Sequence, residues 1–171
     1  MKKLLFLCAV LCAAPLFAQT ENTTEDPTTT SRNEIKVNAP YTIAGFPEIS
    51  YERLLNDTSS LGLSVGFAVD DDFSRRFMAI PYYRFFFGEK KRAAGFFIEV
   101  NGALITEEAE KFDSPSESEF GLGLGFSVGA KVLNKSDWVA EIFLGAGRNF
   151  SGAEGINEAY PRVGISIGKR F

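Results

Sequence analysis

The segment Phe120–Val132 alternates between two kinds of residue with a strict period of two. Its even-numbered positions carry Phe, Leu, Val or Ala, whereas its odd-numbered positions carry Gly, Ser or Lys. A period of two is that of a β-strand, whose successive side chains point to opposite faces. The segment is long for a strand of a soluble protein, and its length suits a tilted strand that crosses a membrane.

The segment Leu61–Val69 repeats this pattern, with large apolar residues at odd positions and Gly, Ser or Ala at even ones. Looser alternation predicts six further strands, at residues 34–43, 46–55, 75–87, 94–105, 138–149 and 159–171. Together with Leu61–Val69 and the first segment, extended to 119–133, this gives about eight strands and no competing helix. Pro40 and Pro81 fall inside two of these strands and predict bulges or breaks there. The strand at 75–87 is apolar on both faces, so its parity stays open.

The connections between these strands alternate in kind. Those at 56–60, 88–92 and 134–137 are short and rich in turn residues. Of the others, 70–74, 106–118 and 150–158 are longer or acidic, whereas 44–45 is short and fits poorly. Tight turns on one side and longer loops on the other are typical of an eight-stranded antiparallel up-and-down transmembrane β-barrel, with the turns and both termini in the periplasm.

The small-residue face identifies the interior of this barrel. A water-facing surface of alternating glycines would be unstable, whereas a narrow lumen needs small residues beside large ones. Charges of both signs share this face, and charges in a closed lumen must be paired. We therefore expect an internal salt-bridge network; the alternative is that several of these charges lie in water at strand ends. The interior candidates are Lys36, Glu48, Glu52, Arg84, Glu99, Asn101, Lys131, Glu141, Arg162 and Arg170.

Aromatic residues on the opposite face gather near the strand ends. Such belts form where a membrane barrel meets the two interfaces. The periplasmic belt would contain Phe85, Phe87, Phe96, Trp138 and Phe171, and the outer belt Tyr41, Phe67, Phe77 and Phe120. Arg53 and Lys169 share the outward parity at periplasmic ends, where long side chains can reach the headgroups.

Residues 1–18 have the form of a secretory signal peptide, with Lys2 and Lys3 before a short apolar run. Residues 19–32 are rich in Thr and predict a disordered tether, which leaves 33–171 for the barrel. Cys8 and Cys12 lie in the signal, and each follows a Leu, which argues against lipid attachment. The exported chain therefore has no Cys for a disulfide or a nucleophile.

The sequence predicts no catalytic residue, no metal site and no cofactor. The chain has no His, which removes the usual general base and the commonest metal ligand. The acidic segment Glu107–Asp113 lacks the ligand spacing of a calcium loop and is expected to be a solvated surface loop. The net charge of −4 argues against nucleic acid as a partner.

The chain from Asn33 to Phe171 resembles small outer-membrane β-barrel proteins of the OmpA/OmpX type. The segments Pro47–Asn56 and Ser60–Gly66 resemble one subfamily of unknown function. The terminal strand is similar to the signal read by the barrel-assembly machinery of outer membranes, and Val163, Ile165, Ile167 and Phe171 would carry it, although Lys169 departs from the pattern. The resemblance implies the cell outer membrane as location, with its lipid and this machinery as partners, and names no extracellular partner.

Three functions remain open. The first is a structural or surface-interaction barrel whose lumen is filled by side chains. The second is a narrow pore or small-ligand transport barrel, and the third is a soluble periplasmic lipocalin-like barrel. The third requires Leu63, Val65, Leu122 and Leu124 to line a cavity, whereas the first two require them to face outward.

Overall fold

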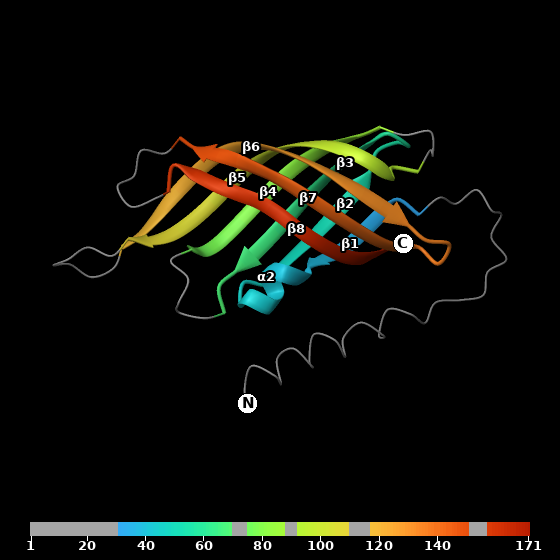
Figure 1. Ribbon diagram of the computed structural model, residues 1–171. Coiled ribbons are helices and arrows are strands. Elements are labelled where there is room, and N and C mark those ends of the chain that lie inside the picture. The colour runs from blue at the N-terminus through green and yellow to red at the C-terminus, as the bar shows by residue number, and fades with distance from the viewer. Residues whose placement is uncertain (1–30, 70–74, 88–91, 110–116, 151–156) are drawn as a thin grey trace, which may run out of the picture. The chain divides into compact units, whose positions relative to one another are not determined.

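The computed structural model describes residues 31–69, 75–87, 92–109, 117–150 and 157–171. The expected signal peptide and most of the expected tether lie outside these residues. Eight strands form one closed barrel, in which each strand is antiparallel to the next and the last pairs with the first (Figure 1). They are β1 (Asn33–Asn38), β2 (Glu48–Leu54), β3 (Ser59–Phe67), β4 (Arg75–Phe87), β5 (Gly95–Ala109), β6 (Glu117–Leu133), β7 (Trp138–Asn149) and β8 (Ala159–Arg170). The expected all-β, eight-stranded up-and-down fold is confirmed.

The two faces of the strands separate as the alternation predicts. In β6, Leu122, Leu124 and Phe126 are exposed by 49%, 61% and 51%, whereas Ser127 and Lys131 are buried. The same rule settles the parity of β4, which the sequence left open. Its inward side chains include Tyr82, Arg84 and Phe86, and its outward ones include Tyr83 and Phe85.

The interior glycines make room for large inward side chains of neighbouring strands. A Cβ at Gly62 would overlap the ring of Tyr82, and one at Gly147 would overlap the ring of Tyr160. The two members of each pair lie on adjacent strands, β3 with β4 and β7 with β8. The small face of the sequence pattern is therefore a packing surface, which lets a narrow barrel fill its own lumen.

The two ends of the barrel differ. The tight-turn end carries the start of β1, the end of β8 and the four-residue turns 55–58 and 134–137. In the second turn, Asn134 Oδ1 accepts the backbone N–H groups of Ser136 and Trp138 at 2.8 and 2.9 Å. The connection between β4 and β5 also lies at this end, where Ala93 N donates to Asp57 O of the first turn at 2.8 Å.

The opposite, loop end carries α2 and the connections between β3 and β4, β5 and β6, and β7 and β8. There β5 and β6 extend further than expected, because their pairing continues to Ala109 and Glu117. The expected loop at 106–118 is therefore wrong for residues 106–109 and 117–118, and Glu107 is buried in the barrel rather than solvated.

A short helix replaces the outer half of the first expected strand. β1 ends at Asn38, and α2 (Ala39–Ala44) follows with Pro40 in its first turn, where the missing N–H is no loss. Gly45 ends the helix at φ 96°, and its N–H bonds to Thr42 O. The expectation of a strand over 34–43 is therefore wrong beyond Asn38, and Pro40 marks the break. Among the described residues, no helix is long and apolar enough to cross a membrane.

The other suspect proline interrupts one ladder without breaking its strand. Pro81 pairs with Leu63 of β3. On the opposite side, the pairing of β4 with β5 stops after Ala79–Leu104 and resumes at Tyr82–Asn101 in the same register. Pro81 cannot donate a hydrogen bond, so the ladder skips it.

Candidate functional site

Eleven charged side chains of the described residues are almost completely buried in the lumen. One of them, Glu107, binds the partly exposed Arg75 at 2.9 Å, and the other ten form one network. They are the carboxylates Glu34, Glu48, Glu52, Glu99 and Glu141 and the cations Lys36, Arg84, Lys131, Arg162 and Arg170. The two signs are equal in number, so the network as a whole is neutral. A neutral set is what a low-dielectric interior requires, because each unpaired charge would cost several kcal/mol.

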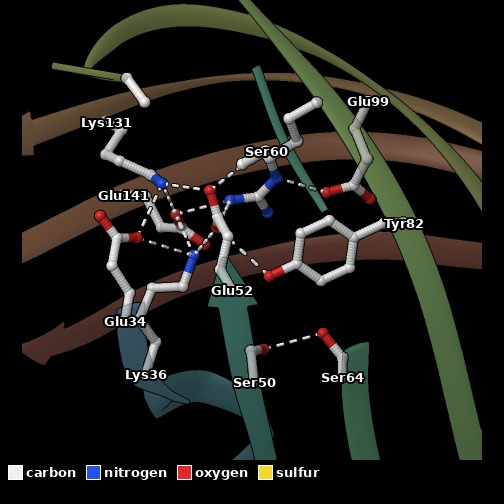
Figure 2. A network of polar contacts seen from close by, with 12 residues as sticks. Glu34, Lys36, Ser50, Glu52, Ser60, Ser64, Tyr82, Glu99, Lys131 and Glu141 are labelled. Atoms are coloured by element: carbon white, nitrogen blue, oxygen red, sulfur yellow. Dashed lines mark hydrogen bonds and ion pairs between the residues drawn. The ribbon is translucent and has the colours of Figure 1, made fainter. Parts of the chain in front are cut away.

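Glu52 of β2 is the centre of this network (Figure 2). Its carboxylate accepts hydrogen bonds from Lys36, from Lys131 at 2.6 Å and from Arg84 at 2.9 Å. Ser60 and Tyr82 donate to it at 2.6 and 3.2 Å. Five donors from β1, β3, β4 and β6 therefore converge on one carboxylate, which joins strands that are not neighbours in the sheet.

A second set of bonds continues from this centre towards the loop end. Glu141 of β7 binds Lys36 at 2.9 Å and Arg84 at 2.8 Å. Arg84 also bonds to Glu99 at 2.7 Å, and Glu99 accepts from Arg162 at 3.0 Å. Arg162 then reaches Glu48 at 2.8 Å. The chain of alternating charges crosses the barrel from wall to wall.

A third set lies towards the tight-turn end. Arg170 of β8 donates through two nitrogens to Glu34 Oε1, at 2.9 and 2.6 Å. Glu34 also accepts from Lys131 at 2.8 Å. The Arg170 guanidinium further donates to the backbone carbonyl of Arg92 at 2.8 Å. The network thus fastens the connection between β4 and β5 to the end of the barrel.

Aromatic rings lie against three of the buried cations. The Arg84 guanidinium lies over the rings of Tyr82 and Phe97, at 4.5 and 4.3 Å from their centroids. Arg162 lies over Phe143 at 4.6 Å, and Lys131 over Phe86 at 4.7 Å. These faces offer cations a second favourable contact.

Two apolar clusters fill the lumen on either side of the charges. The loop-end cluster contains Phe46, Met78, Ile80, Ala103, Ile105 and Tyr160. The tight-turn cluster contains Leu54, Phe86, Ala93, Phe97 and Phe143. The described interior is therefore a packed core with a charged middle layer, and its chemistry favours mutual neutralisation of charges over contact with a ligand.

The structure places every interior residue expected from the sequence inside the barrel and joins them by hydrogen bonds. Asn101 donates to Glu99 at 3.2 Å and accepts from Tyr160 at 2.7 Å. Four further buried residues were not among the interior candidates: Glu34, Asn38, Tyr82 and Glu107. Glu34 and Asn38 share the parity of Lys36, which was the available signal. Among the described residues, no group of three His, Cys, Asp or Glu side chains could hold a metal ion.

The outer face is apolar over the barrel wall. Leu63, Leu122 and Leu124 are exposed by 43%, 49% and 61%, and Val65 shares the outward parity of Leu63. These side chains do not line a cavity, which removes the lipocalin-like alternative.

The expected aromatic belts lie on this face, with one exception. Tyr41 belongs to α2 and packs edge-on against Phe46 at 6.2 Å, so its assignment to the outer belt was wrong. The other expected belt residues are exposed: Phe85, Phe87, Phe96, Trp138 and Phe171 at the tight-turn end, and Phe67, Phe77 and Phe120 at the loop end. Ile165 and Ile167 of the terminal strand also face outward.

Comparison with known proteins agrees with this architecture. The chain is similar to the N-terminal β-barrel domain of Pseudomonas aeruginosa OprF, known from a crystal structure, with a TM-score of 0.61 and 17% sequence identity. The match covers 83% of this chain and 98% of that domain. Among curated proteins, no relative matches the chain. The profile of DUF3575, a family described as a protein of unknown function, matches residues 5–160, and the chain belongs to this family.

Proposed function

We propose that this chain is an integral outer-membrane protein of a Gram-negative bacterium with a structural or surface-interaction role and no enzymatic activity. The observation that carries the proposal is the combination of an apolar outer wall with a neutral, filled lumen. Contact of the large outward Leu, Phe and Ile side chains with water is unfavourable, whereas contact with lipid is favourable. The buried charges of the interior, in turn, are paired with one another.

The asymmetry of the two ends supports an orientation. Barrels of the outer membrane keep short turns in the periplasm and longer loops outside. The tight-turn end, with the termini of the barrel, would therefore face the periplasm. The loop end would carry the surface that meets a partner, and the terminal strand, with Phe171, would be read by the barrel-assembly machinery.

A filled lumen supports the structural role over transport. A narrow pore would require water or solute to pass Arg84, Glu52 and Glu141. Arg84 binds Glu52 at 2.9 Å and Glu141 at 2.8 Å, so these side chains obstruct such a path. Eight-stranded barrels generally have interiors filled by side chains. Single-channel recording in planar bilayers tests this alternative, and steady conductance from the purified protein would favour it.

Fractionation combined with gel electrophoresis of unboiled samples tests the main proposal. We expect the protein in the outer-membrane fraction, resistant to salt extraction, with a heat-dependent change of mobility. Release by a salt wash, or identical mobility before and after boiling, would contradict an integral barrel.

A further inference from the structure

Two cations stand on the otherwise apolar outer wall at the tight-turn end. Arg53 of β2 and Lys169 of β8 are exposed and share the outward parity of Tyr51 and Ile167. β1 is the only strand between them, and it places Asn33 opposite Arg53 and Ile35 opposite Lys169. The two cations therefore flank one short strand near the end of the barrel.

The spacing allows both cationic groups to reach one anion. Neighbouring strands lie about 4.8 Å apart, so the backbones of β2 and β8 are separated by about 10 Å across β1. Arg53 Nη1 donates to Asn33 Oδ1 at 2.7 Å, which turns the guanidinium towards β1 and hence towards β8. Tyr51 Oη donates to the same oxygen at 2.8 Å. The polar groups on this part of the wall are thus drawn towards the gap over β1.

Neither cation is neutralised within the described residues. Arg53 bonds to the neutral Asn33, and no described carboxylate forms an ion pair with it or with Lys169. Asp137, the last residue of the turn before β7, pairs with Arg92 at 3.8 Å. In contrast, Arg148, an exposed cation at the end of β7 nearest the loops, lies 4.0 Å from Glu158.

The surroundings of the pair are those of a lipid interface rather than of water. Trp138 of β7 lies opposite Lys169 of β8, and Tyr51 of β2 lies opposite Ile35 of β1. The row across four strands, Trp138, Lys169, Ile35 and Tyr51, therefore combines three amphipathic side chains with one apolar one. Trp and Tyr in such positions lie at the level of lipid headgroups.

We propose that Arg53 and Lys169 form a binding site for the phosphate headgroup of an anionic phospholipid in the periplasmic leaflet. The phosphate would accept hydrogen bonds from both side chains over β1, and the acyl chains would lie along Ile35 and Ile167. Guanidinium groups suit phosphate because their donors match its oxygens. The inference rests on the proposed membrane location.

Trp138 is the single tryptophan of the chain and lies beside Lys169, so its fluorescence reports on this site. We suggest quenching of the folded full-length barrel in vesicles of phosphatidylcholine by small fractions of brominated phosphatidylglycerol or brominated phosphatidylcholine. Each cation near an anionic headgroup contributes about a fivefold preference. The wild type should therefore be quenched at least about fivefold more efficiently by the anionic lipid.

The variants R53Q and K169Q should each lower this preference, and their combination should bring it close to one. The charge-conserving pair R53K and K169R should keep it, and R148Q should leave it unchanged. Equal quenching by both lipids in the wild type, or an unchanged preference in R53Q/K169Q, would overturn the site. Loss of the preference on adding inorganic phosphate, but not chloride at equal ionic strength, would assign the cations to free phosphate and overturn the lipid proposal. Absence of quenching by either lipid would instead contradict membrane insertion itself.

Discussion

Replacing Glu52 by Gln should destabilise the barrel by about 3 kcal/mol, since removal of one partner from a buried ion pair generally costs 3–5 kcal/mol. Glu52 is fully buried and holds three cations: Lys36, Lys131 and Arg84. Gln keeps the shape and one acceptor oxygen but leaves the lumen with one uncompensated positive charge. We place the cost near the lower limit because each cation keeps a second carboxylate, Glu141 or Glu34.

The measurement is a urea titration of the protein folded in detergent micelles, followed by Trp138 fluorescence and by the mobility of unboiled samples. Destabilisation should lower the midpoint without changing the slope. Glu158, which is 89% exposed and 4.0 Å from Arg148, offers the matched control, and Glu158→Gln should leave the midpoint unchanged.

A second variant separates charge balance from loss of a hydrogen bond. Lys131→Met in the Glu52→Gln background restores a neutral lumen. The double variant should therefore be more stable than the sum of the two single effects by about 1–3 kcal/mol, as expected for residues in one network. A loss below about 1 kcal/mol in Glu52→Gln, the size of an ordinary hydrogen bond, would refute the reasoning. Additive single effects would refute it as well.

Three further changes test the wall, the packing and the terminal strand. Leu124→Arg places a charge on the lipid face and should lower the free energy of unfolding in vesicles by about 2–4 kcal/mol. Ser136→Arg, in a tight turn, should have no measurable effect, and equal effects of the two variants in a vesicle-folding titration would contradict the assignment of faces. Gly62→Ala forces a Cβ into the Tyr82 ring and should destabilise the barrel by about 1–3 kcal/mol. The double variant Gly62→Ala/Tyr82→Leu should recover part of this stability. An unchanged urea midpoint in Gly62→Ala would show that packing does not require the glycine. Phe171→Ala should lower the yield of heat-modifiable barrel in the outer-membrane fraction, and an unchanged yield would remove the assembly-signal hypothesis.

Local alternation in the sequence was enough to predict most of the fold. A period of two assigns each side chain to one of two faces without knowledge of the partner strand. This rule alone predicts that the large apolar residues of β3 and β6 face outward and that the charges of β2 and β7 at inward positions are buried. Even the ambiguous β4 obeys it, because Arg84 can be buried only where carboxylates of other strands reach it.

The partners within the network could not be predicted in this way. Lys131 bonds to Glu34 and Glu52, which lie far from it along the chain. Which carboxylate a lysine reaches depends on the register of every strand between them and on the diameter of the barrel. Neither quantity is encoded in a local period. The helix α2 was not predicted for a different reason: the apolar residues of Ala39–Ala44 continue the alternation of β1. Only Pro40, near the start of the helix, and Gly45, at its end, indicated a change of structure.

The seam between β1 and β8 shows how the barrel tolerates a short first strand. β1 ends opposite Ser166, so the segment of β8 before Ser166 has no strand partner on that side. Along β8 the odd-numbered backbone groups face this seam, as the bond from Phe171 N to Asn33 O shows. Pro161 is one of them, and it has no N–H to leave unpaired. Val163 O instead accepts the side chain of Asn38 at 3.2 Å. Pro161 and Asn38 thus each remove one unpaired backbone group from the seam that a longer β1 would pair by a ladder, and the helix α2 follows Asn38 where that strand would continue.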